Sequence, residues 1–454
     1  MSEINRRSTR RTMLTGAAAA AVGVGVVPQA LAATNTTDHL TADHRRPKKG
    51  DPSPKRPFVT TRNGNFMIGR DKFRFAGTNT YYLHQQSHYM IDAALDDAAK
   101  MALPVIRAWA FADGLSNTIP MQPQPYTYDE AAFDSLDYAV WRAGQLGIRL
   151  SLGFTNNWSS YGGMPQYVSW FLGLADDEYG TAVNHDKFYT TASIKKCYKA
   201  WVKHVVTRVN PYTGLRYNQD PTIMTWELAN EPRNRSDKTG KVLLAWAREM
   251  SAYVKSVAPR QLVALGDEGF YGEAGNTDYP YSDYEGNHWK ELTALPDIDY
   301  GTVHMYPQSW GTAAQADPIG WGTKWITDHI RDGKRLGKPV MIEEFGLTIE
   351  PGPIPDAATR TSGYQTWTTT VLNAGGAADM FWLLTSRNDD GSFYANYDTF
   401  RIIWYPSDPS YPTAQVLSNH AKVMAGVSLA PNRAARALQA PPRVIPKVKA
   451  AKLP

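Results

Sequence analysis

The sequence predicts an α/β fold in which eight parallel strands close into a single (β/α)8 barrel, a TIM barrel with enlarged loops. Between residues 58 and 428, short β-rich runs alternate with longer stretches of helical spacing, which is typical of parallel β/α architecture. Eight such units fit into this segment. A polar or aromatic residue also stands at or just after the end of nearly every strand, at the rim where barrel proteins build their sites.

The predicted strands are short runs of mostly apolar residues, separated by segments such as Leu243–Val257 and Tyr189–Val209 that have helical spacing. In chain order, the strands are Phe73–Gly77, Val105–Ala108, Ile148–Gly153, Ile223–Glu227, Leu262–Leu265, Tyr300–His304, Val340–Glu343 and Met380–Leu384. Tryptophans inside the helical segments are expected to pack between helices and barrel. These are Trp141, Trp201 and Trp246.

The residues at the predicted strand ends share the ability to hydrogen-bond or to present an aromatic ring. They are Asn79, Arg107, Asn156, Asn157, Trp158, Asn230, Glu231, Glu268, His304, Tyr306, Glu344 and Trp382. Because the carboxyl ends of parallel strands meet at one rim, we expect these side chains to converge there.

Composition excludes several classes of protein. The 454 residues are 43% hydrophobic and 20% charged, a globular composition. The single cysteine, Cys197, excludes a disulfide framework and a multi-thiolate metal site. No phosphate loop, dinucleotide fingerprint, paired-histidine zinc motif or Gly-x-Ser-x-Gly elbow is found. The run 388–391 resembles part of a calcium loop, but turn composition explains it. We therefore expect no cofactor and no metal.

The net charge of +5 is concentrated at the two ends of the chain. Residues 1–57 carry ten basic and four acidic residues, and residues 429–454 carry six basic and none acidic. The remaining body has 32 basic and 39 acidic residues. A nucleic-acid-binding protein would carry its positive charge on the folded surface, so no nucleic-acid partner is expected.

The two ends have the composition of a signal and of linkers. Residues 1–32 combine paired arginines, Arg10 and Arg11, with a short apolar run and an Ala-x-Ala site, which predicts a twin-arginine-type signal peptide; an ordinary export signal is the alternative. Residues 33–57 form a Pro-rich basic linker, and residues 429–454 a solvated basic tail that is expected to be disordered. The mature protein is expected to be secreted, monomeric and free of membrane spans.

Two strand-end motifs carry the chemistry. Asn230-Glu231-Pro232 follows the fourth strand, and Glu344-Phe345-Gly346 ends the seventh. Cleavage of a glycosidic bond needs one carboxylic acid to protonate the leaving oxygen and a second carboxylate to attack the sugar or activate water. Asn-Glu-Pro alone is a weak motif, but the combination with Glu-Phe-Gly three strands later is specific.

These motifs, together with Arg107, His304-Met305-Tyr306-Pro307 and Trp382, resemble the clan A retaining glycosidases of glycoside hydrolase family 5. Several local strings are similar to those of the endo-β-1,4-mannanases in that family, and the resemblance covers residues 58–428. The strings are Asn156-Asn157-Trp158, Tyr161-Gly162-Gly163, Asn230-Glu231-Pro232-Arg233, Gly266-Asp267-Glu268-Gly269-Phe270, Tyr397-Asp398, Pro412-Thr413-Ala414 and His420-Ala421.

The resemblance implies that Glu231 is the general acid/base and Glu344 the nucleophile, with carboxyl groups about 5–5.5 Å apart. Glu343 competes for the second role. Because successive strand residues point to opposite faces, we expect only one of the pair to face the pocket, and the family pattern selects Glu344. Glu227 is expected to give structural support.

The other polar residues follow from the same chemistry. Asn230 is expected to bind the sugar 2-hydroxyl, and Arg107 to hold Glu344 ionised by lowering its pKa. Tyr306 would orient the nucleophile. His304 would lie near the acid/base and substrate; a satisfied core histidine is the alternative. Glu231 must start each cycle protonated, so a raised pKa is expected.

The substrate surface is expected to be largely aromatic, because the flat faces of sugars match apolar rings. Trp382 is predicted to form the floor beneath the sugar being cleaved. Arg233 would bind a sugar beyond the cleavage point, with a surface salt bridge as its alternative. Glu268 would contribute to the subsite on the leaving-group side or to a hydrogen-bond network that supports it. The remaining predicted substrate contacts are Asn157, Trp158, Trp310 and Trp109.

The sequence thus predicts a secreted, retaining endo-β-1,4-mannanase acting on mannans, galactomannans and glucomannans. Two alternatives remain open. Another family 5 β-glycanase, acting on cellulose or β-glucan, would share the same catalytic machinery. A non-catalytic polysaccharide-binding barrel is a different class, although the presence of both Glu231 and Glu344 argues against it.

Overall fold

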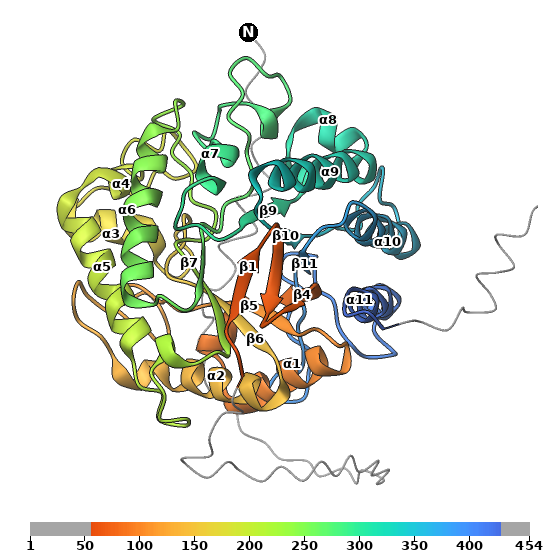
Figure 1. Cartoon of the computed structure of the whole chain (residues 1–454), viewed down its shortest axis with the longest axis horizontal. Coiled ribbons are helices and arrows are strands. Elements are labelled where there is room, and N and C mark those ends of the chain that lie inside the picture. Colours follow the sequence, from red (N-terminus) through yellow and green to blue (C-terminus); the bar gives the residue numbers. More distant parts are fainter. Residues whose placement is uncertain (1–55, 428–454) are drawn as a thin grey trace, which may run out of the picture.

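The computed structural model describes residues 56–427 and contains the predicted barrel (Figure 1). Eight strands form one parallel sheet in the order β8-β7-β6-β5-β4-β11-β10-β9. They are β4 (Phe75–Asn79), β5 (Val105–Trp109), β6 (Arg149–Gly153), β7 (Ile223–Glu227), β8 (Leu262–Ala264), β9 (Gly301–Met305), β10 (Val340–Phe345) and β11 (Ala378–Phe381). The prediction of a (β/α)8 barrel is confirmed.

The barrel closes between β8 and β9 through individual hydrogen bonds. The Asp299 amide donates to the Val263 carbonyl at 2.8 Å, and the Asp299 carboxylate accepts from the Val263 amide at 2.6 Å. Further along, the His304 amide donates to the Glu268 carbonyl at 3.1 Å. These contacts hold the end of β9 beside the loop after β8, so residues from both enter the same site.

Helices surround the strands on the outside, as Figure 1 shows. They are α1 (His88–Lys100), α2 (Asp134–Leu146), α3 (Gly163–Leu172), α4 (Lys187–Thr190), α5 (Ala192–Thr207), α6 (Lys241–Val257), α7 (Trp289–Thr293), α8 (Gly311–Ala316), α9 (Pro318–Leu336), α10 (Ala357–Asn373) and α11 (Tyr411–Met424). Short 3-10 turns are η1 (Tyr81–Gln85), η2 (Glu130–Phe133), η3 (Tyr217–Gln219), η4 (Tyr279–Tyr281) and η5 (Pro307–Ser309). No helix within residues 56–427 is both long and apolar enough to cross a membrane.

Local sequence explains where these helices begin and end. In α9, the Asp317 side chain accepts a hydrogen bond from the Gly320 amide at 2.9 Å, and Pro318 occupies the first turn. Both features are preferred at helix starts. The helix ends at Gly337, whose φ of 70° places it in the left-handed conformation that favours glycine.

A small antiparallel sheet at the start of the described chain was not predicted. It comprises β1 (Val59–Arg62), β2 (Asn65–Ile68) and β3 (Asp71–Lys72). Val59 and Phe66 of this sheet are buried in one apolar cluster with residues from the amino-terminal halves of the barrel strands, such as Phe75 and Met341. The sheet therefore covers the end of the barrel opposite the predicted site, which leaves the other rim for function.

Some predicted boundaries needed correction. The helix predicted over Tyr189–Val209 is two helices, α4 and α5, because Thr191 has an extended backbone with ψ of 117°. The strand predicted over Phe73–Gly77 is β4, which begins and ends two residues later than predicted. The strand predicted over Met380–Leu384 is β11, which begins and ends earlier than predicted. Residues 1–55 and 428–454 lie outside the described structure, and with them the predicted signal peptide, most of the linker and the tail. Arg56 and Pro57, the end of that linker, contact the barrel through hydrogen bonds to Gly144 and Arg149.

Candidate active site

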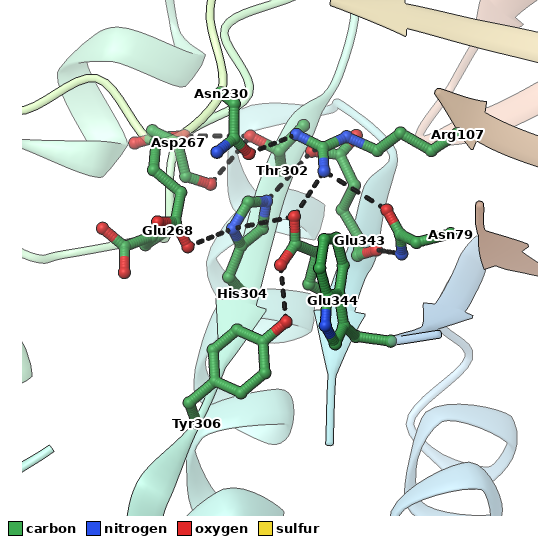
Figure 2. A network of polar contacts seen from close by, with 12 residues as sticks. Asn79, Arg107, Asn230, Asp267, Glu268, Thr302, His304, Tyr306, Glu343 and Glu344 are labelled. Carbon is green, nitrogen blue, oxygen red and sulfur yellow. Dashed lines mark hydrogen bonds and ion pairs between the residues drawn. The ribbon is translucent and has the colours of Figure 1, made fainter. Parts of the chain in front are cut away.

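The carboxyl ends of the strands bring most of the predicted polar residues together (Figure 2). Asn79 ends β4, Arg107 lies in β5, and Glu227 ends β7. Asn230 and Glu231 follow β7, Asp267 and Glu268 follow β8, His304 lies in β9, and Tyr306 follows it. Glu343 and Glu344 lie in β10 just before its last residue, and Trp382 follows β11. The prediction that these side chains share one rim is confirmed by this arrangement.

Arg107 is the fully buried cation at the centre of this network. Its Nε donates to Glu227 at 2.7 Å, its Nη2 to the Asn230 side-chain oxygen at 2.8 Å, and its Nη1 to both Asn79 and Glu344. Burial alone would lower the pKa of Arg107, but Glu227 and two neighbouring carboxylates raise it above its ordinary value. The guanidinium therefore stays charged and fixes the positions of the surrounding oxygens.

Both glutamates at the end of β10 face the network, so the expectation that only one of them can do so is wrong. Glu344 contacts Arg107 and accepts a hydrogen bond from the Tyr306 hydroxyl at 2.6 Å. Glu343 lies 3.2 Å from His304 Nε2 and 3.6 Å from Arg107 Nε. The physical reason is an irregularity in strand pairing, because the register between β10 and β9 shifts between Ile342 and Glu344.

The electrostatic effect on Glu344 differs from the predicted one. Burial raises the pKa of Glu344, and the positive charges of His304 and Arg107 oppose that rise without cancelling it. Burial likewise raises the pKa of Glu343 to about 7, with the charge of Glu227 adding to the effect. Arg107 thus lowers the pKa of Glu344 relative to what burial alone would give, but not below its ordinary value.

Glu231 occupies a constrained backbone position after β7. Its φ is 50°, in the left-handed region that non-glycine residues rarely adopt. The Glu231 amide donates to the Gly266 carbonyl at 2.7 Å. A Cβ on Gly266 would lie 2.0 Å from the Ala229 carbonyl oxygen, so only glycine allows this close approach of the two loops. Unusual backbone of this kind is concentrated at functional sites.

The side chain of Glu231 is held from two sides. Trp158 Nε1 donates to Glu231 Oε2 at 2.5 Å, and His304 Nδ1 lies 3.0 Å from Glu231 Oε1. Burial would lower the pKa of His304, but Glu344, together with hydrogen bonds to Glu231 and Glu343, raises it well above its ordinary value. A protonated imidazole donates from both nitrogens, so His304 links Glu231 to Glu343. It is thus buried and hydrogen-bonded on both nitrogens, as a satisfied core histidine would be, but its partners are carboxyl groups of the site.

The two key carboxylates are close together. One oxygen of Glu231, one of Glu344 and a ring nitrogen of His304 all lie within 4.8 Å of one another. Among the described residues, these three are the one cluster of acidic, histidine or cysteine side chains close enough together to hold a metal ion. A protonated His304 has no lone pair to donate to a metal, so the arrangement suits proton transfer between carboxyl groups instead.

The aromatic side of the site centres on Trp382, which is partly buried. Its Nε1 donates to Asp398 at 2.7 Å, and its ring stacks on Tyr81 with 5.2 Å between centroids and an interplanar angle of 7°. Trp109 is more deeply buried. Arg107 Cζ lies over its ring at 4.7 Å from the ring centroid, and the Tyr81 ring centroid is 5.8 Å away. Tyr81 and Trp382 therefore present more accessible ring area than Trp109.

Trp310 does not occupy its predicted position in a sugar subsite. Only 1% of it is exposed, and it packs against Phe270, Trp321 and Trp325 with centroids 5.3 to 5.9 Å apart. An aromatic platform must expose a ring face. Trp310 is a core residue of the cluster that supports the loop after β8.

Arg233 and Glu268 form a buried ion pair, which differs from the surface salt bridge considered as an alternative. Arg233 donates to both oxygens of Glu268 at 2.6 and 2.7 Å and to Glu285 at 2.9 Å. Its backbone amide donates to the Asn157 side chain at 3.0 Å, and its guanidinium lies 4.8 Å from the Trp158 ring centre. These residues therefore act together to position the loops beside Glu231.

Several residues of the site were not among those predicted to function. Glu343 has an acidic side chain next to the nucleophile candidate, but strict alternation argued against it. Asn79 was recognised as a rim residue, and it binds Arg107 at 3.2 Å and the Glu343 carbonyl at 2.8 Å. Asp398 lies in a matched string, yet only the structure shows its hydrogen bond to Trp382.

Comparisons with known proteins agree with this geometry. A family model described as GH family 5 β-mannosidase-like matches residues 56–382. Mannan endo-1,4-β-mannosidase 1 from Solanum lycopersicum is 33% identical over 385 residues, covering 82% of this chain and 92% of the tomato protein. The structure of an endo-β-1,4-mannanase from Thermotoga petrophila is 39% identical with a TM-score of 0.70, covering 78% of this chain and 77% of that one. The endo-1,4-β-mannanase of Rhizomucor miehei is 33% identical with a TM-score of 0.71, covering 81% and 99%.

Proposed function

The chain belongs to the GH family 5 β-mannosidase-like family, and from this membership we propose that it hydrolyses internal β-1,4-mannosidic bonds with Glu344 as nucleophile and Glu231 as acid/base. The protein is a glycoside hydrolase, a mannan endo-1,4-β-mannosidase, and mannan is its substrate. The observation that supports the catalytic roles is the separation of the two carboxylates, whose nearest oxygens lie within 4.8 Å. Retaining glycosidases hold their carboxyl groups about 5–5.5 Å apart, whereas inverting enzymes need about 6.5–9.5 Å to admit a water molecule.

In the first step, the Glu231 carboxylic acid gives its proton to the glycosidic oxygen while a Glu344 oxygen attacks the anomeric carbon. The bond to the leaving sugar breaks, and an ester forms between the remaining sugar and Glu344. Tyr306 fixes one oxygen of Glu344 by its hydrogen bond at 2.6 Å, and Arg107 contacts the other. These contacts hold the nucleophile in one orientation before the sugar arrives.

In the second step, Glu231 removes a proton from water as the water attacks the anomeric carbon, and the ester to Glu344 breaks. Configuration at the anomeric carbon is retained, because two inversions occur. Asn230 is fixed by Arg107 and by a 2.9 Å hydrogen bond to Asn156. Its amide has a second N–H that can donate to the sugar 2-hydroxyl, where hydrogen bonding stabilises the transition state. His304 Nδ1 lies 3.0 Å from Glu231 and 3.7 Å from Glu344, so its positive charge acts on both catalytic carboxylates.

The test is product analysis on mannan, galactomannan, glucomannan and carboxymethylcellulose, with Glu344→Ala as the matched inactive variant. Mannobiose and mannotriose as products of the mannans, retained anomeric configuration in early products, and loss of activity in the variant are the expected results. External azide should restore turnover in Glu344→Ala by forming an α-mannosyl azide. A variant that retained wild-type turnover would refute the role of Glu344. Cleavage of cellulose alone would refute the substrate.

We also propose that residues 1–32 direct export by the twin-arginine pathway and that the mature enzyme is a secreted monomer joined to a basic linker and tail. The paired arginines followed by a short apolar run support the export route. Replacing Arg10 and Arg11 with lysine should prevent appearance of the enzyme in the medium while leaving its activity in lysates. Continued secretion would point to an ordinary export signal. Light scattering after size-exclusion chromatography would test the monomer.

A further inference from the structure

The side of the site that receives the leaving sugar is identified by Glu231, so this inference rests on the proposed function. A general acid must reach the glycosidic oxygen, and the leaving sugar lies beyond that oxygen. Trp158 is an aromatic residue in contact with Glu231, because its Nε1 donates to the carboxylate at 2.5 Å. Sugar rings on the leaving-group side must therefore pass over the surface around Trp158.

Trp158 itself offers almost no ring surface to a sugar. Only 4% of it is exposed. The Arg233 guanidinium lies 4.8 Å from its ring centre, and the Tyr179 ring stacks on it with 5.1 Å between centroids and an interplanar angle of 15°. A catalytic carboxylate needs only one reachable oxygen, but an aromatic platform needs an open face. Another ring must serve as the platform here.

Tyr179 has the exposed surface that Trp158 lacks. It is 39% exposed, so part of its ring is accessible to a ligand. Its ring is nearly parallel to the Trp158 ring and adds a second, more exposed ring to the same aromatic stack. A pyranose ring stacked on Tyr179 would lie on the leaving-group side of Glu231.

The turn that carries Tyr179 is held rigidly. The Asp177 carboxylate accepts hydrogen bonds from the amides of His185 and Asn184 at 2.9 and 3.1 Å and from the Thr181 hydroxyl at 3.0 Å. Amide donors lower the pKa of Asp177, although burial alone would raise it. This side chain therefore closes the turn over residues 177–185.

The same turn is fastened to the loops on both sides of Glu231. The Ser159 hydroxyl donates to the Glu178 carboxylate at 3.0 Å, and Arg235 donates to the Glu178 carbonyl at 3.3 Å. At the other end, His185 Nε2 lies 2.8 Å from the Asn157 carbonyl oxygen. Tyr179 directly follows Glu178, so its ring position is coupled to the loops that carry Trp158 and Arg233.

We propose that Tyr179 is a specificity-determining residue that binds a mannosyl ring on the leaving-group side of the cleavage point. Its ring face would stack against the C–H face of the sugar, and the turn over residues 177–185 positions it for that contact. Trp158 has a different task, which is to orient Glu231 and to support the Tyr179 ring from beneath.

The test compares two substrates in wild type, Tyr179→Ala, Tyr179→Phe and Tyr89→Ala. Mannopentaose places sugars on the leaving-group side, whereas 2,4-dinitrophenyl β-mannobioside places none there. Tyr89 is a matched control, because it is a tyrosine that is 50% exposed and lies on α1, outside the turn over residues 177–185. Circular dichroism and thermal unfolding would establish that each variant is folded.

Tyr179→Ala should raise KM for mannopentaose about tenfold, equivalent to about 1.4 kcal/mol, with kcat little changed. Its kinetics on the aryl mannobioside should match wild type, and Tyr179→Phe and Tyr89→Ala should behave as wild type on both substrates. Unchanged kinetics of Tyr179→Ala on both substrates would refute the proposal. Equal losses on both would refute it too, because the residue would then act through Trp158 and Glu231. A wild-type protein that cleaves neither substrate would refute the proposed function itself.

Discussion

Glu343 provides a sharp test of the electrostatics of the site. It is fully buried between His304 and Arg107, yet among the described residues no donor lies within hydrogen-bond distance of its Oε1. An oxygen without a donor is a poor place for negative charge. Burial accordingly raises the pKa of Glu343 to about 7 from an ordinary value of 4.5. The perturbation is Glu343→Gln, which keeps the size and one acceptor but removes the titration.

The magnitude follows from proton linkage. A carboxyl whose pKa is raised in the folded state contributes its full stability below pH 4.5 and loses it as the pH rises to about 7. One pKa unit corresponds to about 1.4 kcal/mol, so the free energy of unfolding of the wild type should fall by about 3 kcal/mol from this group across that interval. The folded state binds the extra proton, which gives the fall its sign. Glu343→Gln should lack this contribution.

The assay is urea denaturation of wild type and Glu343→Gln at pH 5, 6, 7 and 8, followed by tryptophan fluorescence. Wild type should lose about 2–3 kcal/mol of unfolding free energy relative to Glu343→Gln as the pH rises from 5 to 8. Glu350→Gln is the control, because its side chain is exposed and accepts a hydrogen bond from Gln308, which does not titrate. Parallel pH profiles for wild type and Glu343→Gln would refute the reasoning, since the buried carboxyl would then not titrate in this range.

Three further predictions concern the residues that support the site. Trp158→Phe removes the N–H that donates to Glu231 at 2.5 Å, so kcat/KM on mannopentaose should fall about 10- to 100-fold, the value of a hydrogen bond to a charged group. Asp398→Ala leaves the Trp382 indole N–H without its acceptor and should cost about 1–3 kcal/mol in chemical denaturation, with Asp398→Asn restoring most of it. Gly266→Ala introduces a Cβ 2.0 Å from a carbonyl oxygen at a φ of 83°, so thermal unfolding should show destabilisation by more than about 2 kcal/mol. Wild-type stability of Gly266→Ala would contradict the tight packing of its loop against the loop after β7.

Most of the fold could be predicted from the sequence, because buried parallel strands are apolar along their whole length. All five residues of β7, for example, are buried, and the predicted range Ile223–Glu227 matches it. The amino-terminal sheet escaped prediction because β3 has only two residues, both exposed, and carries no alternating pattern. The break at Thr191 also escaped, since apolar spacing continues across it while one backbone angle changes.

The site was predictable where a residue type and a strand end coincide, as for Glu231, Glu344 and His304. Prediction was wrong where side-chain direction decides the role. Trp310 follows a strand motif, but nothing in the sequence indicates that its ring turns into a core cluster. Alternation excluded Glu343 because a strand irregularity has no sequence signal here. Tyr179 lies in a loop, where no periodicity relates it to Trp158.

The charges of the site explain why two adjacent glutamates occupy one strand end. Arg107 and His304 supply two positive charges, whereas Glu227, Glu343 and Glu344 supply three potential negative charges in the same buried volume. Glu231, 3.0 Å from His304, adds no charge while it carries the proton of the general acid. Buried charge is costly unless it is balanced. Glu343 is the member best able to take up a proton, because one of its oxygens lacks a donor while Glu344 is bonded by both Arg107 and Tyr306. With Glu343 neutral, the two cations face two carboxylates. Glu344 can then carry the negative charge that its attack on the sugar requires.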